Sequence, residues 1–189
     1  MSTRANITIK NGESKIILYR HYDGYPTNTG IDILNRIKRS KTTSDLVSDF
    51  LTATNWSGFE NPPKKLYEIT TEIHGDIEYD YEITVPKYNH NFHYEDSEGN
   101  YPNMPTITVK ERKIINGLAS GFDSDDYLVS WTTIHENKTY KELLPIWKRS
   151  SDKEIATYAS GKTEKEMEFL GYSAEQINAA RERLKKNEY

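Results

Sequence analysis

TRANITIKNGESKIILYRH, which runs from Thr3 to His21, alternates apolar and polar residues on both sides of Asn11-Gly12. Asn-Gly is the dipeptide that most readily takes the positive φ angles of a type I′ turn, so we expect a β-hairpin with a two-residue turn here. Opposite residues of a hairpin share a face, and counting outward places Ala5 opposite Leu18. One face is then polar and includes Arg4 and His21, whereas the other is apolar and carries Ala5, Ile7, Ile9, Ile16 and Leu18.

The rest of the chain shows both helical and strand periodicity. Two short amphipathic helices are expected after the hairpin, one with Ile31, Leu34 and Ile37 on a single side and one capped by Thr43-Ser44-Asp45. The pattern is helical again from Tyr140 onward. Four further strands are predicted, of which the first two form a hairpin around His74-Gly75-Asp76: residues 66–73, 77–85, 106–115 and 127–134.

These elements predict an α+β fold: an antiparallel sheet opened by the N-terminal β-hairpin, two short helices after it, and a C-terminal helical segment. We expect an α+β core domain over residues 1–138 and a C-terminal helical extension over residues 139–189 that packs on the core. The three tryptophans, Trp56, Trp131 and Trp147, are expected to lie in the core.

Composition excludes several classes of protein. The 189 residues carry 25 basic and 29 acidic side chains, for a net charge of -4, and they include no cysteine. A disulfide framework, a thiolate nucleophile and a cysteine-based zinc site are therefore excluded, and nonspecific binding to duplex nucleic acid is disfavoured. No apolar run reaches the roughly 18–20 residues needed to cross a bilayer, and no signal peptide is recognisable. We expect a cytoplasmic protein with no membrane partner.

The segment Tyr19-Arg20-His21-Tyr22-Asp23-Gly24-Tyr25-Pro26 gathers a guanidinium, an imidazole, a carboxylate and three phenols at the end of a predicted strand. These groups suit recognition of an anion and an aromatic base. Arg20 falls on the apolar face, where it would need a partner such as Asp23. The alternative is a structural lock in which Arg20 pairs with Asp23. The predicted ligand-binding residues are Arg4, Arg20, His21, Tyr22, Asp23 and Tyr25.

Other constellations carry weaker signals. Ser2 could act as an N-terminal nucleophile opposite His21 if Met1 is removed. His90 and His93, with Glu95 and Asp96, could bind a metal, but solvated loop histidines are the favoured interpretation. Asp123-Ser124-Asp125-Asp126 lacks the glycine and the glutamate of a calcium loop. We expect neither a metal nor a cofactor.

The segment Ser2-Thr3-Arg4-Ala5-Asn6-Ile7, followed by Tyr19–Pro26 and by Gly30 at a helix start, resembles a family of short proteins encoded by phages and prophages. The resemblance covers roughly the first 35 residues. It implies an origin in a mobile element, a location in the host cell cytosol and an action on host machinery. It implies no catalytic residue.

Three functions follow from these expectations. The first is a counter-defence protein that binds and sequesters an anionic nucleotide-type host immune signal. The second is a hydrolase that acts on a nucleotide signal or an amide through His21 with Ser2 or Tyr25. The third is an inhibitor that docks on a host defence protein, including a CRISPR or nuclease effector, through the Tyr79-Asp80-Tyr81-Glu82 strand or the C-terminal helices.

Binding is preferred over hydrolysis because no carboxylate pair, metal set or nucleophile triad has a recognisable spacing. Edge strands and abundant tyrosine are also compatible with a homo-oligomer.

Overall fold

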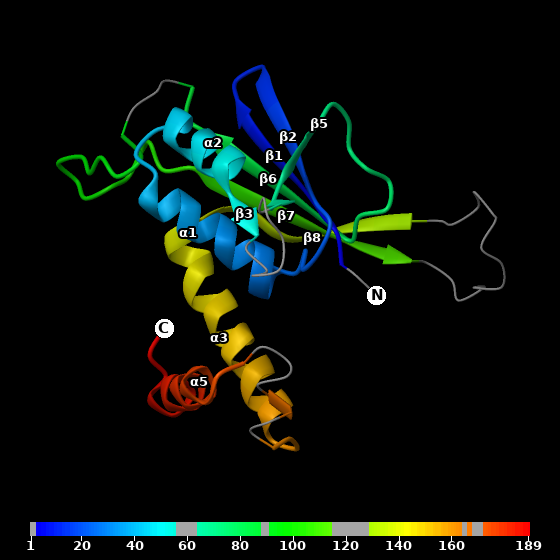
Figure 1. Ribbon diagram of the computed structural model, residues 1–189. Coiled ribbons are helices and arrows are strands. Elements are labelled where there is room, and N and C mark those ends of the chain that lie inside the picture. The colour runs from blue at the N-terminus through cyan, green and yellow to red at the C-terminus, as the bar shows by residue number, and fades with distance from the viewer. Residues whose placement is uncertain (1–2, 56–63, 88–90, 115–128, 164–165, 168–171) are drawn as a thin grey trace, which may run out of the picture.

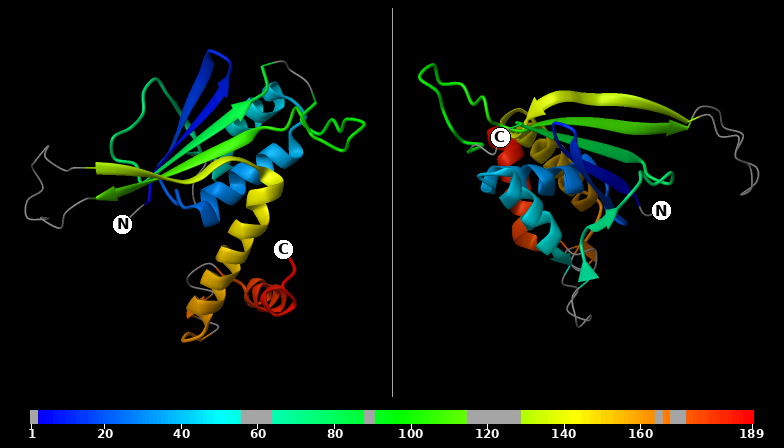
Figure 2. Two further views of the ribbon diagram at one scale, coloured as in Figure 1. Left: turned by 180° about the vertical axis from the view of Figure 1, so that it is seen from behind. Right: turned by 90° about the horizontal axis from the view of Figure 1, so that it is seen from above.

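A computed structural model describes residues 3–55, 64–87, 91–114, 129–163, 166–167 and 172–189. The predicted α+β class is confirmed: a six-stranded sheet in the order β5-β2-β1-β6-β7-β8 carries helices on one of its faces (Figures 1 and 2). We call the other face, which no described helix covers, the open face. Because strand side chains alternate between faces, the two sides of the sheet carry different kinds of residue.

The N-terminal hairpin consists of β1 (Ala5–Asn11) and β2 (Ser14–Arg20). Asn11 pairs with Ser14, so the two-residue loop is Gly12-Glu13 and the predicted register is wrong by two residues. Gly12 has a φ of +60°, as expected for the first central position of a type II′ turn. A shift of two residues keeps every side chain on its predicted face, because the side-chain period of a strand is two.

The predicted second hairpin is wrong. The strands β5 (Glu68–Thr70) and β6 (Tyr79–Val85) lie on opposite sides of the first hairpin, β5 beside β2 and β6 parallel to β1. The sheet is therefore mixed rather than entirely antiparallel. In this arrangement Tyr81 and Ile83 lie next to Ile7 and Ile9, so a continuous apolar surface faces the helices.

The sheet is completed by β7 (Thr106–Ile114) and β8 (Val129–Thr139), the latter at its edge. A separate pair of short strands, β3 (Thr54–Asn55) and β4 (Lys64–Lys65), follows the second helix.

Both predicted helices after the hairpin are present. A π-helical turn, η1 (Pro26–Gly30), leads directly into α1 (Ile31–Arg39). The next helix, α2 (Thr43–Thr52), begins with a capping box in which Thr42 and Asp45 satisfy each other's backbone N–H groups. Capping boxes also open the two C-terminal helices, α3 (Tyr140–Ala159) and α5 (Ala174–Lys186).

The core lies between the sheet and the helices, and α3 contributes Leu143 and Trp147 to it. The Trp147 indole N–H donates to His135 Nε2 at 3.2 Å. Trp131 is 42% exposed near the start of the edge strand β8, so its predicted core position is wrong, and Trp56 lies outside the described residues. A second small hydrophobic cluster joins the far end of α3 to α5. The domain boundary at 138/139 stays a prediction.

None of the helices in the described part of the chain is both long enough and apolar enough to cross a bilayer.

Candidate functional site

The structure separates the six predicted ligand-binding residues into different surroundings. Arg20 is buried on the helix-facing side of the sheet, whereas Arg4 and His21 belong to the open face. Asp23 and Tyr25 line a cleft beside α3. The sixth residue, Tyr22, is 67% exposed. They therefore do not form one pocket.

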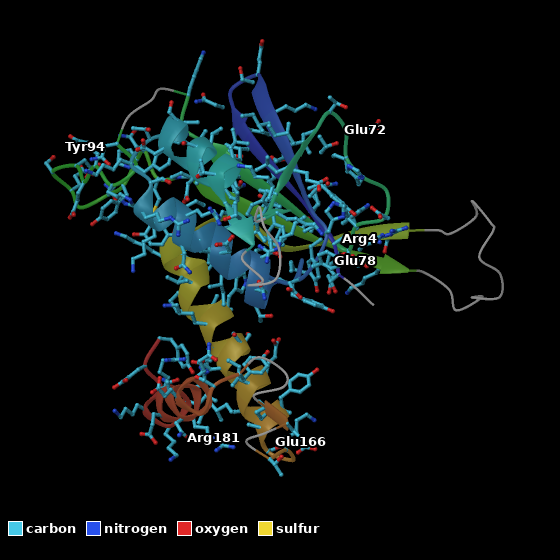
Figure 3. All side chains as sticks on the ribbon, viewed as in Figure 1. Arg4, Glu72, Glu78, Tyr94, Glu166 and Arg181 are labelled. Atoms are coloured by element: carbon cyan, nitrogen blue, oxygen red, sulfur yellow. The ribbon has the colours of Figure 1, made fainter. Side chains whose placement is uncertain are left out.

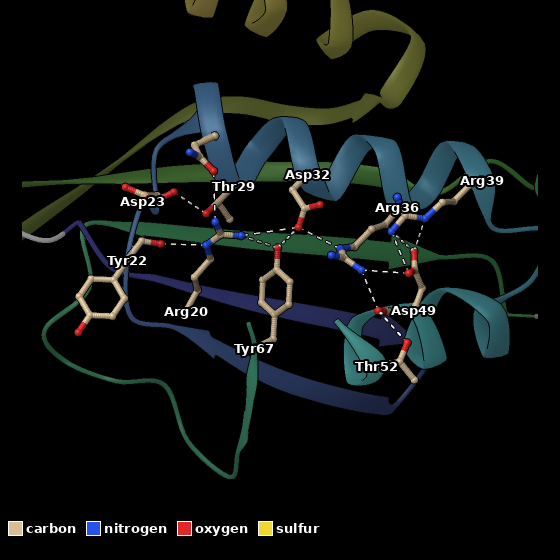
Figure 4. A network of polar contacts seen from close by, with 11 residues as sticks. Arg20, Tyr22, Asp23, Thr29, Asp32, Arg36, Arg39, Asp49, Thr52 and Tyr67 are labelled. Carbon is tan, nitrogen blue, oxygen red and sulfur yellow. Dashed lines mark hydrogen bonds and ion pairs between the residues drawn. The ribbon is translucent and has the colours of Figure 1, made fainter. Parts of the chain in front are cut away.

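Arg20 is held by a network of polar contacts and is 7% exposed (Figure 4). Its Nε donates to the Tyr22 carbonyl at 2.8 Å, and its Nη1 donates to the Tyr67 hydroxyl at 3.0 Å. Nη2 donates to Asn28 Oδ1 at 3.2 Å. The facing carboxylate is that of Asp32, at 3.6 Å, so the expected pairing with Asp23 is wrong. These contacts fix the guanidinium in a structural position.

The network extends from Asp32 across α1 to α2 (Figure 4). Asp32 Oδ2 accepts from Arg36 Nε at 3.0 Å and from the Tyr67 hydroxyl. Asp49 then accepts from Arg36 Nη1 at 3.0 Å and from Arg39 Nε at 2.6 Å. Burial, together with the Asp32 charge, raises the pKa of Tyr67. The network ties β2, α1 and α2 together, because each buried guanidinium has a carboxylate partner.

The predicted ligand-binding residues of the open face, Arg4 and His21, have partners within the protein. Arg4 forms an ion pair with Asp76 and donates its backbone N–H to Glu78 Oε2 at 2.6 Å. Arg4 and Glu78 lie close together and apart from Arg181 of α5 (Figure 3). His21 Nε2 lies 3.1 Å from Glu68 Oε1. Arg4 and His21 thus each face a carboxylate, which weakens their attraction for an added anion.

The turn after β2 is fixed against the sheet. Asp23 has a φ of +57°, and its carbonyl accepts from the Thr29 hydroxyl at 2.6 Å and from the Thr29 N–H at 3.2 Å. The Gly24 N–H donates to the Thr3 carbonyl at 2.9 Å, and the Gly24 carbonyl accepts from the Tyr81 hydroxyl at 2.7 Å. A side chain at Gly24 would meet the backbone of Arg4 at 2.8 Å, so the close approach requires glycine.

This turn forms one wall of a cavity of about 680 Å³, which we call the aromatic cleft. The opposite wall is the second half of α3. Its lining includes three phenols and two carboxylates, and none of the described residues that line it is basic. The aromatic, acidic and amide side chains of this lining are Asp23, Tyr25, Asn28, Glu154, Tyr158 and Tyr172.

A second cavity of about 650 Å³, the α3–α5 groove, shares Ser151, Ile155 and Tyr172 with the aromatic cleft. Residues three or four positions apart lie on neighbouring parts of a helix surface, so Ser151 and Ile155 form a ridge that both cavities reach. The groove has an apolar floor that includes Leu144 and Pro145. The two cavities are therefore neighbours along α3, and we refer to them together as the composite cleft.

The polar side of the α3–α5 groove contains both signs of charge. Asp152 is buried and accepts from Arg183 Nε at 2.8 Å and from Arg183 Nη2 at 2.7 Å. The hydrogen bond to Asp152 raises the pKa of Arg183, so the guanidinium stays charged. Glu188 also lines the groove. Lys148 forms no ion pair within the part of the chain that the structure describes, which makes its ammonium the cation most available to a ligand.

Sequence reasoning identified Asp23 and Tyr25 but missed the contribution of α3 and α5. The available signal was the helical spacing of Lys148, Ser151, Ile155 and Tyr158, which lie three or four residues apart. That spacing places them along one side of a helix, but it does not reveal that the 23–28 turn lies opposite.

The remaining candidates from the sequence lie only partly within the described residues. Within the described residues, no group of three or more histidine, aspartate and glutamate side chains could hold a metal ion. His93 Nε2 lies 3.0 Å from the Ser40 carbonyl. The other candidates lie outside the described residues: Ser2, His90 and Asp123–Asp126.

No protein-family model, curated protein or solved structure matches this chain. The composite cleft is therefore the feature of this chain that bears most directly on its function.

Proposed function

We propose that this protein binds a nucleotide-type small molecule in the composite cleft. The observation that supports the proposal is the junction of an aromatic, acidic cavity with a groove that offers Lys148. Taken together with the resemblance to phage-encoded proteins, this ligand class suggests a counter-defence role. In that role the protein would sequester an anionic host immune signal in the host cytosol.

The chemistry of the two cavities suits different parts of such a ligand. The rings of Tyr25, Tyr158 and Tyr172 offer stacking surfaces, and stacking of a base on an aromatic ring contributes about 1–3 kcal/mol. Carboxylates accept hydrogen bonds from ribose hydroxyls and from amino groups. Phosphate oxygens would extend into the α3–α5 groove toward Lys148.

The proposal keeps the nucleotide-type ligand that the sequence predicts. Its anionic part is expected near Lys148 instead of at Arg20 and Arg4. Arg20 is engaged by protein partners, and Arg4 belongs to the open face with Asp76. Asp23 and Tyr25 remain ligand-binding candidates.

Sequestration is preferred over hydrolysis because the predicted base and nucleophile have separate surroundings. His21 lies beside Glu68, whereas the Tyr25 ring packs 6.1 Å from that of Tyr79 and lines the aromatic cleft. Docking through β6 is less favoured, because β6 pairs with a strand on each side.

Isothermal titration calorimetry with nucleoside monophosphates and cyclic dinucleotides tests the proposal. Tyr158→Ala should weaken binding about tenfold, which corresponds to 1.4 kcal/mol. The matched control is Tyr94→Ala, because Tyr94 is also exposed and lies far from α5 (Figure 3).

Mass spectrometry of the recovered ligand then separates the two functions. An intact ligand supports sequestration, and a cleaved ligand supports hydrolysis. Absence of binding to every nucleotide would contradict the proposal and would direct attention to a host protein as the partner.

A further inference from the structure

Two carboxylates in the lining of the aromatic cleft act as hydrogen-bond acceptors. Asp23 and Glu154 are the ionisable groups other than tyrosine that line it, and an ionised carboxylate can only accept hydrogen bonds. They come from different elements, the turn after β2 and α3. These carboxylates therefore favour a ligand that presents hydrogen-bond donors to the cleft.

One donor in the same cleft is oriented by the buried network. Arg20 Nη2 donates to Asn28 Oδ1 at 3.2 Å. A guanidinium can only donate, so the amide oxygen of Asn28 must face it and the amide nitrogen remains as a donor. Asn28 also lines the aromatic cleft. Arg20, predicted to bind the ligand directly, thus acts as a positioning residue for Asn28.

We infer that the aromatic cleft selects guanine among the nucleobases. This inference rests on the proposed function, because it concerns the base of the proposed nucleotide ligand. Guanine presents two neighbouring donors, N1–H and the 2-amino group, next to the O6 acceptor. The donors match the two oxygens of a carboxylate, a pairing strengthened by the negative charge, and O6 matches the amide nitrogen of Asn28.

The other bases fit this pattern less well. Adenine and cytosine each present an amino donor beside a ring nitrogen that can only accept, and an acceptor placed against a carboxylate is repelled. Uracil presents a single N–H between two carbonyl acceptors. Because a site built to pair with a donor rejects an analogue that lacks it, discrimination should be substantial even with similar stacking.

Calorimetric titration with GMP, IMP, AMP, CMP and UMP tests the inference. IMP lacks the 2-amino group but keeps N1–H and O6. We expect GMP to bind about tenfold more tightly than AMP, CMP or UMP, with IMP between them. Asp23→Asn and Glu154→Gln replace one acceptor oxygen by a donor at nearly constant volume, and asparagine tolerates the positive φ of residue 23.

At least one of the two substitutions should reduce the ratio of AMP to GMP dissociation constants to about threefold or less. Equal affinity for GMP and AMP would overturn the guanine inference while leaving nucleotide binding intact. A guanine preference that survives both substitutions would also overturn it. Failure of all five nucleotides to bind would instead contradict the proposed function itself.

Discussion

Replacement of Asp32 by asparagine tests the buried network that fixes the turn beside the aromatic cleft. Its Oδ2 accepts from Arg36 Nε at 3.0 Å and from the Tyr67 hydroxyl, and it lies 3.6 Å from Arg20 Nη1. Asp32→Asn keeps the size of the side chain but removes the negative charge between two buried guanidinium groups.

Removing one partner of a buried ion pair costs about 3–5 kcal/mol. The Asp32 side chain is 27% exposed, and water at that surface screens part of the effect. We therefore expect Asp32→Asn to lower the free energy of unfolding by about 2–3 kcal/mol. Asp76→Asn is the matched control, because it removes the same charge from an exposed ion pair with Arg4 and should cost at most about 1 kcal/mol.

Urea unfolding followed by tryptophan fluorescence measures both variants. The midpoint for Asp32→Asn should fall while the dependence of the free energy on urea stays unchanged. A loss equal to that of Asp76→Asn would refute the assignment of the network as a major stabilising element.

Three further predictions concern packing and pH. Gly30→Ala should lower the thermal unfolding temperature, because the added Cβ would lie 2.8 Å from Trp147 Cζ3. The overpacking cost of about 1–3 kcal/mol should outweigh the gain in helix propensity of about 1 kcal/mol. An unchanged or raised unfolding temperature would contradict this. Hydrogen bonds from the Thr139 backbone N–H, from Lys138 and from the Thr139 hydroxyl lower the pKa of Glu142 from 4.5 to about 2. The stability that this cap contributes is therefore lost progressively as pH falls from about 4.5 to about 2. Circular dichroism should show that loss, and Glu142→Gln should make it smaller. Burial raises the pKa of Tyr67 above 10.0, so the free energy of unfolding should fall as pH rises beyond that value. Urea titrations at alkaline pH should show a smaller fall in the free energy of unfolding for Tyr67→Phe than for the wild type.

The faces of the N-terminal hairpin could be predicted from sequence more securely than its register. A period of two assigns Ile7 and Leu18 to the same side whichever two consecutive residues form a two-residue turn. The register depends on whether Asn11 lies inside the turn or closes it, and the sequence Asn-Gly-Glu allows both. The parallel pairing of β1 with β6 is a non-local choice that no short pattern encodes.

The candidate site shows the same division between local and non-local information. The alternation of side chains along the strand predicted that Arg20 lies on the buried face, and the structure confirms it. Its carboxylate partner, Asp32, could not be identified, because that contact depends on how α1 is rotated against the sheet. Lys148 and Tyr158 follow the turn by more than a hundred residues, so only the packing of α3 brings them to the same cleft.

An NMR titration of the isotope-labelled protein with GMP tests whether the composite cleft binds a nucleotide, because it reports both binding and its location. We expect saturable shifts in the backbone signals of the residues within 23–28 and 148–158 that line the composite cleft, and in that of Tyr172. Shifts concentrated instead on Arg4, His21 and their open-face neighbours, or no shifts at all, would contradict it.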